Sequence, residues 1–179
     1  MKRIILQLGN PRLRLKAKDV TDIQSRQVNS LITDLLQIVK EVDGVGISAP
    51  QVGVNSRIFI LASRPNKRYP NAPFMEPTAI INPKIVSHSK KTLLDWEGCL
   101  SIPGIRALVA RFAKIGVEYT NTDGILIKRD FEGFIAKIFQ HELDHLNGIL
   151  FLDRVKNNRN IVTDLEYQKI IHKKLRIKL

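Results

Sequence analysis

The chain has 179 residues, of which 44% are hydrophobic and 26% are charged. This length is typical of one domain, and the hydrophobic fraction is large enough to bury a core, which excludes a wholly disordered chain. No run approaches the roughly 18 to 20 apolar residues of a membrane helix, and the amino-terminal apolar run is too short for a signal peptide. We therefore expect one cytoplasmic domain over residues 1–179 without membrane association. Cys99 is the only cysteine, so an internal disulfide is excluded.

Basic residues outnumber acidic ones in this sequence. Lysine and arginine total 29 against 17 for aspartate and glutamate, which gives a formal net charge of +12. Residues 154–179 carry a net charge of +6, half of the total, and form a basic carboxy-terminal extension. Such charge favours contact with a polyanion, but it is equally typical of a solvated surface. Aromatic residues make up only 6%, and Tyr167 alone lies among the terminal basic residues, so we expect no sequence-specific nucleic-acid binding.

The first predicted element is a long amphipathic helix. Thr21-Asp22-Ile23-Gln24 has the form of a capping box, and Asp43-Gly44 is typical of a helix end. Six apolar residues between them recur at helical spacing: Val28, Leu31, Ile32, Leu35, Val39 and Val42. Four prolines between residues 63 and 77 predict a surface loop. Short strands are expected at residues 57–62, 79–86 and 91–95.

The second half of the chain begins with a predicted β-hairpin. Apolar residues alternate over residues 115–119 and 125–127, and Asp123-Gly124 between them is a turn signal. Residues 133–147 predict a helix that Gly148 ends. The basic extension holds a second helical pattern, with an apolar stripe of Ile161, Leu165, Ile170 and Leu175. Because helices and strands are segregated along the chain, we expect an α+β fold with antiparallel sheets.

The segment with the clearest chemical meaning is His141-Glu142-Leu143-Asp144-His145. Positions i and i+4 of a helix lie on one face, so two imidazoles at this spacing can bind one metal ion. The carboxylate of Glu142 between them can then reach a metal-bound water. A surface pair of histidines is the simpler alternative.

A third ligand would decide the class of the metal site, and three positions are candidates. In metalloproteases of the metzincin type a third histidine follows, but Phe151 stands at that position and cannot bind a metal. Glu166 lies 21 residues after His145, at a spacing that another class of metalloprotease uses. The third candidate is Cys99, whose thiolate is a strong ligand for zinc or ferrous iron. A lone cysteine is more often a small buried hydrophobic residue, but a charged residue and a glycine precede this one.

A further cluster spans residues 44–51. Gly44 and Gly46 allow the backbone to approach a ligand closely, and Gln51 supplies a neutral amide donor that suits an oxyanion. A Gly-x-Gly segment after a helix is more often a simple turn. It is not a dinucleotide-binding fingerprint, because the helix precedes the glycines and no third glycine follows at the required spacing.

In their order along the chain, these three segments resemble the motifs of the peptide deformylase family. They read GVGISAPQ (residues 44–51), EGCLS (97–101) and QHELDH (140–145). The likeness covers nearly the whole chain and includes NPRLR at 10–14, INP at 81–83 and HLNGILFLDR at 145–154. Two positions differ, since Ser48 stands where the family usually has alanine and Ala110 where proline is common. The extension after Arg154 matches least.

The resemblance implies a metal with water and three protein ligands: Cys99, His141 and His145. It further implies that Glu142 takes the proton of that water, and that the amide of Gln51 and the backbone N–H of Leu100 stabilise the developing oxyanion. The implied reaction removes the formyl group from formyl-methionine of newly synthesised polypeptides and releases formate. A Cys-His-His set accepts zinc, iron, nickel or cobalt, and the resemblance favours Fe(II) as the physiological ion.

The same resemblance gives candidate residues for substrate binding. An apolar slot for the methionine side chain would be formed by Val45, Phe134 and Ile138, although these residues are equally typical of a core. Gly46 would allow close approach of the substrate, and Arg106 would lie near the peptide backbone. Arg111 and Asp144 are expected to orient the metal-binding helix.

We therefore expect an α+β fold in which antiparallel sheets pack around a central metal-binding helix, with an amino-terminal amphipathic helix and a basic carboxy-terminal helix. The expected partners are N-formyl-methionyl nascent peptides, and the extension over residues 154–179 is a candidate for docking on the ribosome. Two alternatives stay open. One is an endopeptidase that uses His141, His145 and Glu166. The other is a nucleic-acid or ribosome-binding module with a structural metal, although such a site usually has four protein ligands and the sequence offers no clear fourth.

Overall fold

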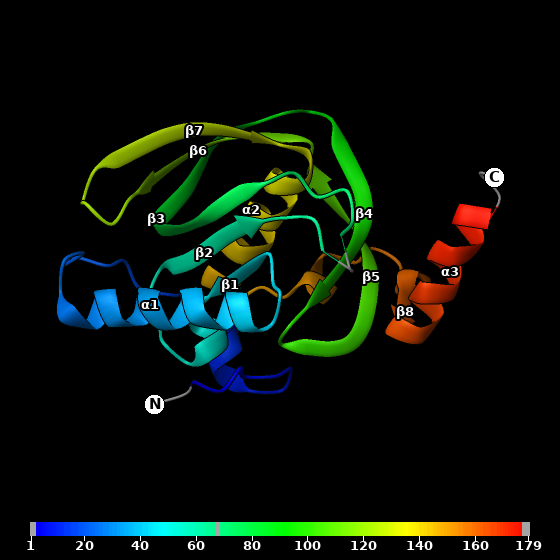
Figure 1. Cartoon of the computed structure of the whole chain (residues 1–179), viewed down its shortest axis with the longest axis horizontal. Coiled ribbons are helices and arrows are strands. Elements are labelled where there is room, and N and C mark those ends of the chain that lie inside the picture. Colours follow the sequence, from blue (N-terminus) through cyan, green and yellow to red (C-terminus); the bar gives the residue numbers. More distant parts are fainter. Residues whose placement is uncertain (1–2, 67–68, 177–179) are drawn as a thin grey trace.

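The computed structural model describes residues 3–66 and 69–176, with side chains up to His172. These residues form two antiparallel sheets (Figure 1). The five-stranded sheet has the order β1-β2-β3-β6-β7, with β1 Gly46–Ser48, β2 Ile58–Ser63, β3 Met75–His88, β6 Lys114–Thr120 and β7 Leu126–Glu132. The three-stranded sheet has the order β4-β5-β8, with β4 Thr92–Cys99, β5 Ile102–Phe112 and β8 Ile161–Thr163. The predicted α+β class with antiparallel sheets is confirmed.

Three α-helices of the described residues accompany the sheets: α1 (Arg26–Glu41), α2 (Gly133–Leu146) and α3 (Asp164–Arg176). Helix α2 contacts β1, β2 and β7 of the larger sheet and β5 of the smaller one, and Figure 1 shows it at the centre of the molecule. Helix α1 packs on β1 and β2, whereas α3 lies at the periphery beside β5 and β8. Short 3₁₀ helices are η1 (Pro11–Arg14), η2 (Ala49–Val52), η3 (Phe151–Arg154) and η4 (Asn158–Asn160). Within the described part of the chain, no helix is both long and apolar enough to span a membrane.

The start of α1 differs from the prediction. The helix begins at Arg26, and Ser25 is its N-cap, with the side chain accepting a hydrogen bond from the backbone N–H of Val28 at 3.4 Å. The prediction of a capping box at residues 21–24 is therefore wrong, because a second capping residue closer to the apolar repeat satisfies the free N–H group. The predicted end is confirmed, since the helix stops at Glu41, just before Asp43.

The strands are longer than their sequence patterns indicate. β3 includes Pro77, where its pairing with β2 shifts register between Leu61 and Ser63, and Pro83, where its pairing with β6 shifts between Ile81 and Lys84. Proline is tolerated at such irregular positions because the ladder hydrogen bond is already interrupted there. β5 was not predicted, because Pro103 and Gly104 at its start hide the apolar alternation that follows.

The predicted apolar stripe of the carboxy-terminal helix is wrong in two of its members. Ile161 lies in β8, where it pairs with Ala107 of β5, and Leu165 is 68% exposed at the start of α3. The side chain of Leu175 lies outside the described residues. The helix thus attaches to the body through its first turns and through β8 rather than through a continuous apolar face.

The core is organised by β2, whose side chains are buried on both faces. Ile58 and Ile60 join the cluster under α1, whereas Phe59 and Leu61 join the cluster under α2. This alternation follows from the two-residue period of a strand. The larger sheet is therefore covered by α1 on one face and by α2 on the other, which fixes α2 firmly in place.

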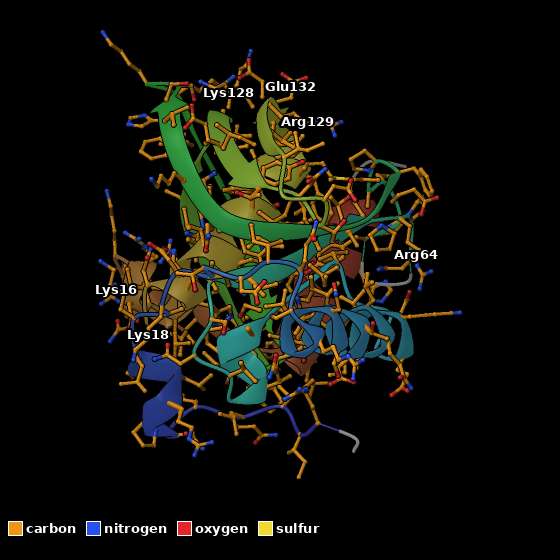
Figure 2. All side chains as sticks on the ribbon, turned by 90° about the vertical axis from the view of Figure 1, so that its left-hand side faces the viewer. Lys16, Lys18, Arg64, Lys128, Arg129 and Glu132 are labelled. Carbon is orange, nitrogen blue, oxygen red and sulfur yellow. The ribbon has the colours of Figure 1, made fainter. Side chains whose placement is uncertain are left out.

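Several basic side chains outside the carboxy-terminal extension also reach solvent. Figure 2 shows Lys16 and Lys18 on one side of the molecule and Lys128 and Arg129 on another, all pointing away from the ribbon. All four are exposed. The positive charge is therefore distributed over more than one surface. The extension over residues 154–179 carries half of the net charge.

Phe59 tests the packing between β2 and α2, because its ring meets Phe139 edge-on with centroids 5.1 Å apart. We expect Phe59→Ala to lower the free energy of unfolding by about 3–5 kcal/mol through the cavity it leaves. Phe74→Ala is the matched control, because that ring is 71% exposed, and should change it by less than about 0.5 kcal/mol. Urea unfolding followed by circular dichroism measures both, and equally small losses would contradict this core.

Candidate active site

Three side chains with metal-binding chemistry meet where β4 ends against α2. Cys99 is the last residue of β4, and His141 and His145 lie one turn apart on α2. The Sγ atom of Cys99 lies 3.2 Å from Nε2 of His145, and one ligand atom from each of the three residues lies within 4.8 Å of the others. These three residues could therefore hold one ion.

A buried set of ion pairs holds this arrangement. Glu97, two residues before Cys99, accepts a hydrogen bond from Nδ1 of His141 at 2.8 Å. Arg111 of β5 donates to both Glu97 oxygens at 2.7 and 3.0 Å, and to Asp144 of α2 at 2.5 Å. Arg111 and Asp144, which were both expected to orient the metal-binding helix, are thus bound to each other. Because Nδ1 of His141 is held by Glu97, its Nε2 would be the atom that binds a metal ion, as in carboxylate–histidine–metal arrangements.

The charges of this cluster follow from its contacts. Burial opposes ionisation of Glu97, but hydrogen bonds from Arg111 and His141 lower the pKa of Glu97 to about 2. Burial likewise raises the pKa of the Cys99 thiol, yet the two histidines outweigh it and hold that pKa well below its usual range. The site therefore favours the thiolate, which is the form that binds a metal.

Glu142 lines the same cavity as Cys99 and His141, and one of its carboxylate oxygens makes no hydrogen bond to a described residue. Its side chain is buried, and burial raises the pKa of Glu142 to about 7. Its Oε2 has no hydrogen-bond partner among the described residues. A Cβ added at Gly46 would lie 2.5 Å from Oε1 of Glu142, so only glycine leaves room for this carboxylate. A sulfur and two imidazole nitrogens with an unpaired carboxylate beside them fit a divalent ion and its water.

Gln51 is held with its amide nitrogen toward this cluster. The Oε1 atom accepts hydrogen bonds from the backbone N–H of Ser48 at 2.9 Å and from its hydroxyl at 3.1 Å. The Nε2 atom is thereby directed to Sγ of Cys99 at 3.4 Å and to the hydroxyl of Ser101 at 3.2 Å. The serine at position 48 thus fits and adds a hydrogen bond that alanine could not make.

A cavity opens from the cluster, and the predicted substrate residues line it. They are Val45, Gly46, Arg106, Phe134 and Ile138, and the predicted oxyanion residue Leu100 lies beside them. Sequence reasoning did not assign Tyr69, Lys137 and Asp164, which line the outer part of the same cavity. It also gave Glu97 no role, although a charged residue two positions before a candidate metal ligand is a usable signal.

The competing third ligands lie elsewhere. Glu166 is an exposed residue of α3 and pairs with Lys169 at 2.7 Å, so it does not join the histidines. Phe151 is buried, and its ring stacks on that of His141 with centroids 6.1 Å apart. Phe151, at the position of the third histidine in metzincin-type proteases, thus packs against the His141 ring and does not bind a metal.

Comparison with known proteins agrees with this geometry. Residues 2–160 match the family described as polypeptide deformylase. The chain belongs to the peptide deformylase family. It is 56% identical over 169 residues to peptide deformylase 2 of Nostoc sp., covering 94% of each chain. It is 41% identical to peptide deformylase 1 of Prochlorococcus marinus, covering 94% of this chain and 90% of the relative.

Solved structures give the same result. A class I type b peptide deformylase from Acinetobacter baumannii with bound Met-Ala-Ser superposes with a TM-score of 0.84 at 40% identity, covering 87% of this chain and 99% of that one. An actinonin complex from Synechococcus elongatus has a TM-score of 0.77 at 34% identity and covers 96% and 85%. The predicted resemblance is confirmed. The chain is a metal-dependent hydrolase of the family that removes the formyl group from nascent peptides.

Glu97 offers a test of how the metal-binding histidine is oriented. Glu97→Gln keeps the side-chain shape but removes the charge that Arg111 and His141 face, so we expect metal affinity to fall about 10- to 100-fold. Competition with a chelator measures this affinity. Glu118→Gln on β6, which breaks a pair with Lys128 outside the site, is the matched control. Equal affinity in the two variants would show that Glu97 does not orient His141.

Proposed function

We propose that Cys99, His141 and His145 hold one divalent ion, and that this ion is physiologically Fe(II). The observation that carries the proposal is the meeting of the three ligand atoms within 4.8 Å beside the cavity, which Cys99 and His141 line. A thiolate with two imidazoles suits ferrous iron and also accepts zinc, nickel or cobalt, so these can occupy the site in purified protein. When bound, the ion lowers the pKa of water toward about 7 and polarises the formyl carbonyl.

Glu142 is the proposed base and acid of the reaction. It takes a proton from water as the water oxygen attacks the formyl carbon, and then gives that proton to the departing amine. The C–N bond breaks, so that formate and a free methionyl amine leave. A pKa of about 7 suits both roles, because proton exchange is most efficient near the working pH.

The proposed oxyanion donors are the Gln51 amide and the backbone N–H of Leu100. The two hydrogen bonds from Ser48 hold the Gln51 amide in place before substrate arrives, so that little reorganisation is needed as charge develops on the formyl oxygen. One such donor contributes on the order of 10²–10³ in rate.

Specificity is proposed to rest on shape and on backbone contacts. Val45, Phe134 and Ile138 form the apolar slot for the methionine side chain, and Gly46 lets the substrate lie close to Glu142. Because formyl is the smallest acyl group, a tight oxyanion pocket admits it and excludes acetyl by steric clash. Arg106 holds the backbone of residues that follow methionine.

We further propose that residues 1–179 form one catalytic domain that works in the cytoplasm on nascent chains, with the extension at 154–179 docking on the ribosome. The surplus of positive charge in that extension supports this docking, because it is attracted to the phosphates of ribosomal RNA.

Glu142→Gln tests the proposed base. The variant should keep its metal, because the three ligands are unchanged, but lose about 10²–10⁴-fold in kcat. Formate release from a formyl-methionyl peptide measures kcat, and elemental analysis measures the metal. Glu132→Gln is the matched control, since Glu132 precedes the same helix but points to solvent (Figure 2) and should not alter kcat. Near-normal turnover in Glu142→Gln would remove Glu142 from its assigned role.

The acyl preference is tested with anaerobically purified protein and two peptides that differ only in the acyl group, formyl-Met-Ala-Ser and acetyl-Met-Ala-Ser. We expect formate from the first peptide and no acetate from the second, because the extra methyl group clashes in the oxyanion pocket. Release of both acids at similar rates would contradict a pocket selective by size. Cleavage between internal residues would favour the endopeptidase alternative.

A further inference from the structure

Arg106 is held on several sides at the outer wall of the cavity. Its side chain is only 11% exposed. Its Nε donates to Asp164 at 2.7 Å, and its Nη1 donates to the hydroxyl of Tyr69 at 3.3 Å. The guanidinium also lies over the Tyr167 ring, 5.3 Å from the centroid. These contacts fix the plane of the group, while no hydrogen bond among the described residues uses Nη2.

The guanidinium also lies against the backbone that leads to the metal cluster. A Cβ added at Gly98 would lie 2.5 Å from Nη1 of Arg106, so the glycine before Cys99 lets the two approach closely. The position of Arg106 is thereby defined relative to Cys99. A side chain that holds Arg106 in place therefore also sets the distance between the Arg106 guanidinium and the metal-binding end of the cavity.

The carboxy-terminal helix supplies that group. β8 pairs with β5 at Arg106 itself, opposite Val162, and Asp164 follows as the first residue of α3. Tyr167, one turn later, packs edge-on against Trp96 of β4 with centroids 5.5 Å apart. Figure 1 shows α3 leaving the body next to β5 and β8. These residues lie beyond residue 160, where the match to the family ends.

We propose that Asp164 is a positioning residue, and that α3 thereby forms part of the binding site for the substrate residues that follow methionine. The Asp164 carboxylate holds Nε of Arg106 with a charge-assisted hydrogen bond, so that Nη2 is directed to a backbone carbonyl of the peptide. This rests on the proposed function of the cavity. It extends that function by giving the helix of the basic extension a direct role in peptide recognition.

The alternative explanation is that Asp164 only stabilises the start of α3. An acidic residue in the first turn stabilises a helix through its dipole, and Glu166 does the same in the same turn. Glu166 pairs with Lys169 instead of Arg106. The two carboxylates therefore provide a matched pair of substitutions that remove the same charge from the same helix turn.

The experiment compares Asp164→Asn with Glu166→Gln in the metal-loaded full-length enzyme, on formyl-Met-Ala-Ser and on the short substrate formyl-Met amide. For Asp164→Asn we expect KM for the tripeptide to rise about 10-fold relative to KM for the short substrate, the scale of a lost contact to a charged donor. The effect on kcat should be much smaller. Glu166→Gln should behave as the unmodified enzyme, and Asp164→Glu should restore most of the tripeptide KM.

A binding measurement and a second variant complete the test. Calorimetric titration with Met-Ala-Ser, the tripeptide product, should show the same weakening for Asp164→Asn without any turnover. Asp164→Ser, which also removes the carboxylate and leaves the Thr163 hydroxyl that accepts from the backbone N–H of Glu166 unchanged, should match Asp164→Asn if positioning of Arg106 is the cause. An unchanged tripeptide KM, or equal losses on both substrates, would overturn the proposal. Failure of the proposed function would be seen separately, as no formate from formyl-Met amide with the unmodified enzyme.

Discussion

The site depends on the buried guanidinium of Arg111, which lies between carboxylates of two different elements. It joins Glu97 of β4 to Asp144 of α2, and all three side chains are almost fully buried. Removing one partner of such a pair costs about 3–5 kcal/mol, because the other charge stays buried without compensation. Glu97 lies two residues before Cys99 and Asp144 one before His145, so these ion pairs fix the sulfur relative to the imidazoles.

The packing of α2 against the core keeps the metal-binding side chains in a defined arrangement. Helix α2 buries Phe139 against the larger sheet and turns its next face, with His141 and Glu142, toward the cavity. A site on a packed helix keeps its side chains in place better than a site on loops. Strand β5 extends this constraint to the outer wall of the cavity, since it carries Arg111 near its end and Arg106 in its middle.

Much of this could be predicted from the sequence, because the motifs are local. The two histidines lie one helix turn apart, and this spacing alone indicates a common metal ion. The third ligand does not, because nothing in the spacing chooses between Cys99 and Glu166, and only the resemblance or the fold decides. Asp164 was missed since its partner lies 58 residues away. The start of α1 was misplaced because two capping residues precede the apolar repeat, and the one closer to it, Ser25, is the N-cap.

The most direct test of the account is X-ray absorption spectroscopy at the metal edge of the zinc-loaded protein, because it reports the ligand atoms without reference to activity. The account predicts one sulfur at about 2.3 Å and two imidazole nitrogens at about 2.0–2.1 Å, with a light-atom ligand in the remaining position. A first shell of nitrogen and oxygen alone, without sulfur, would contradict it.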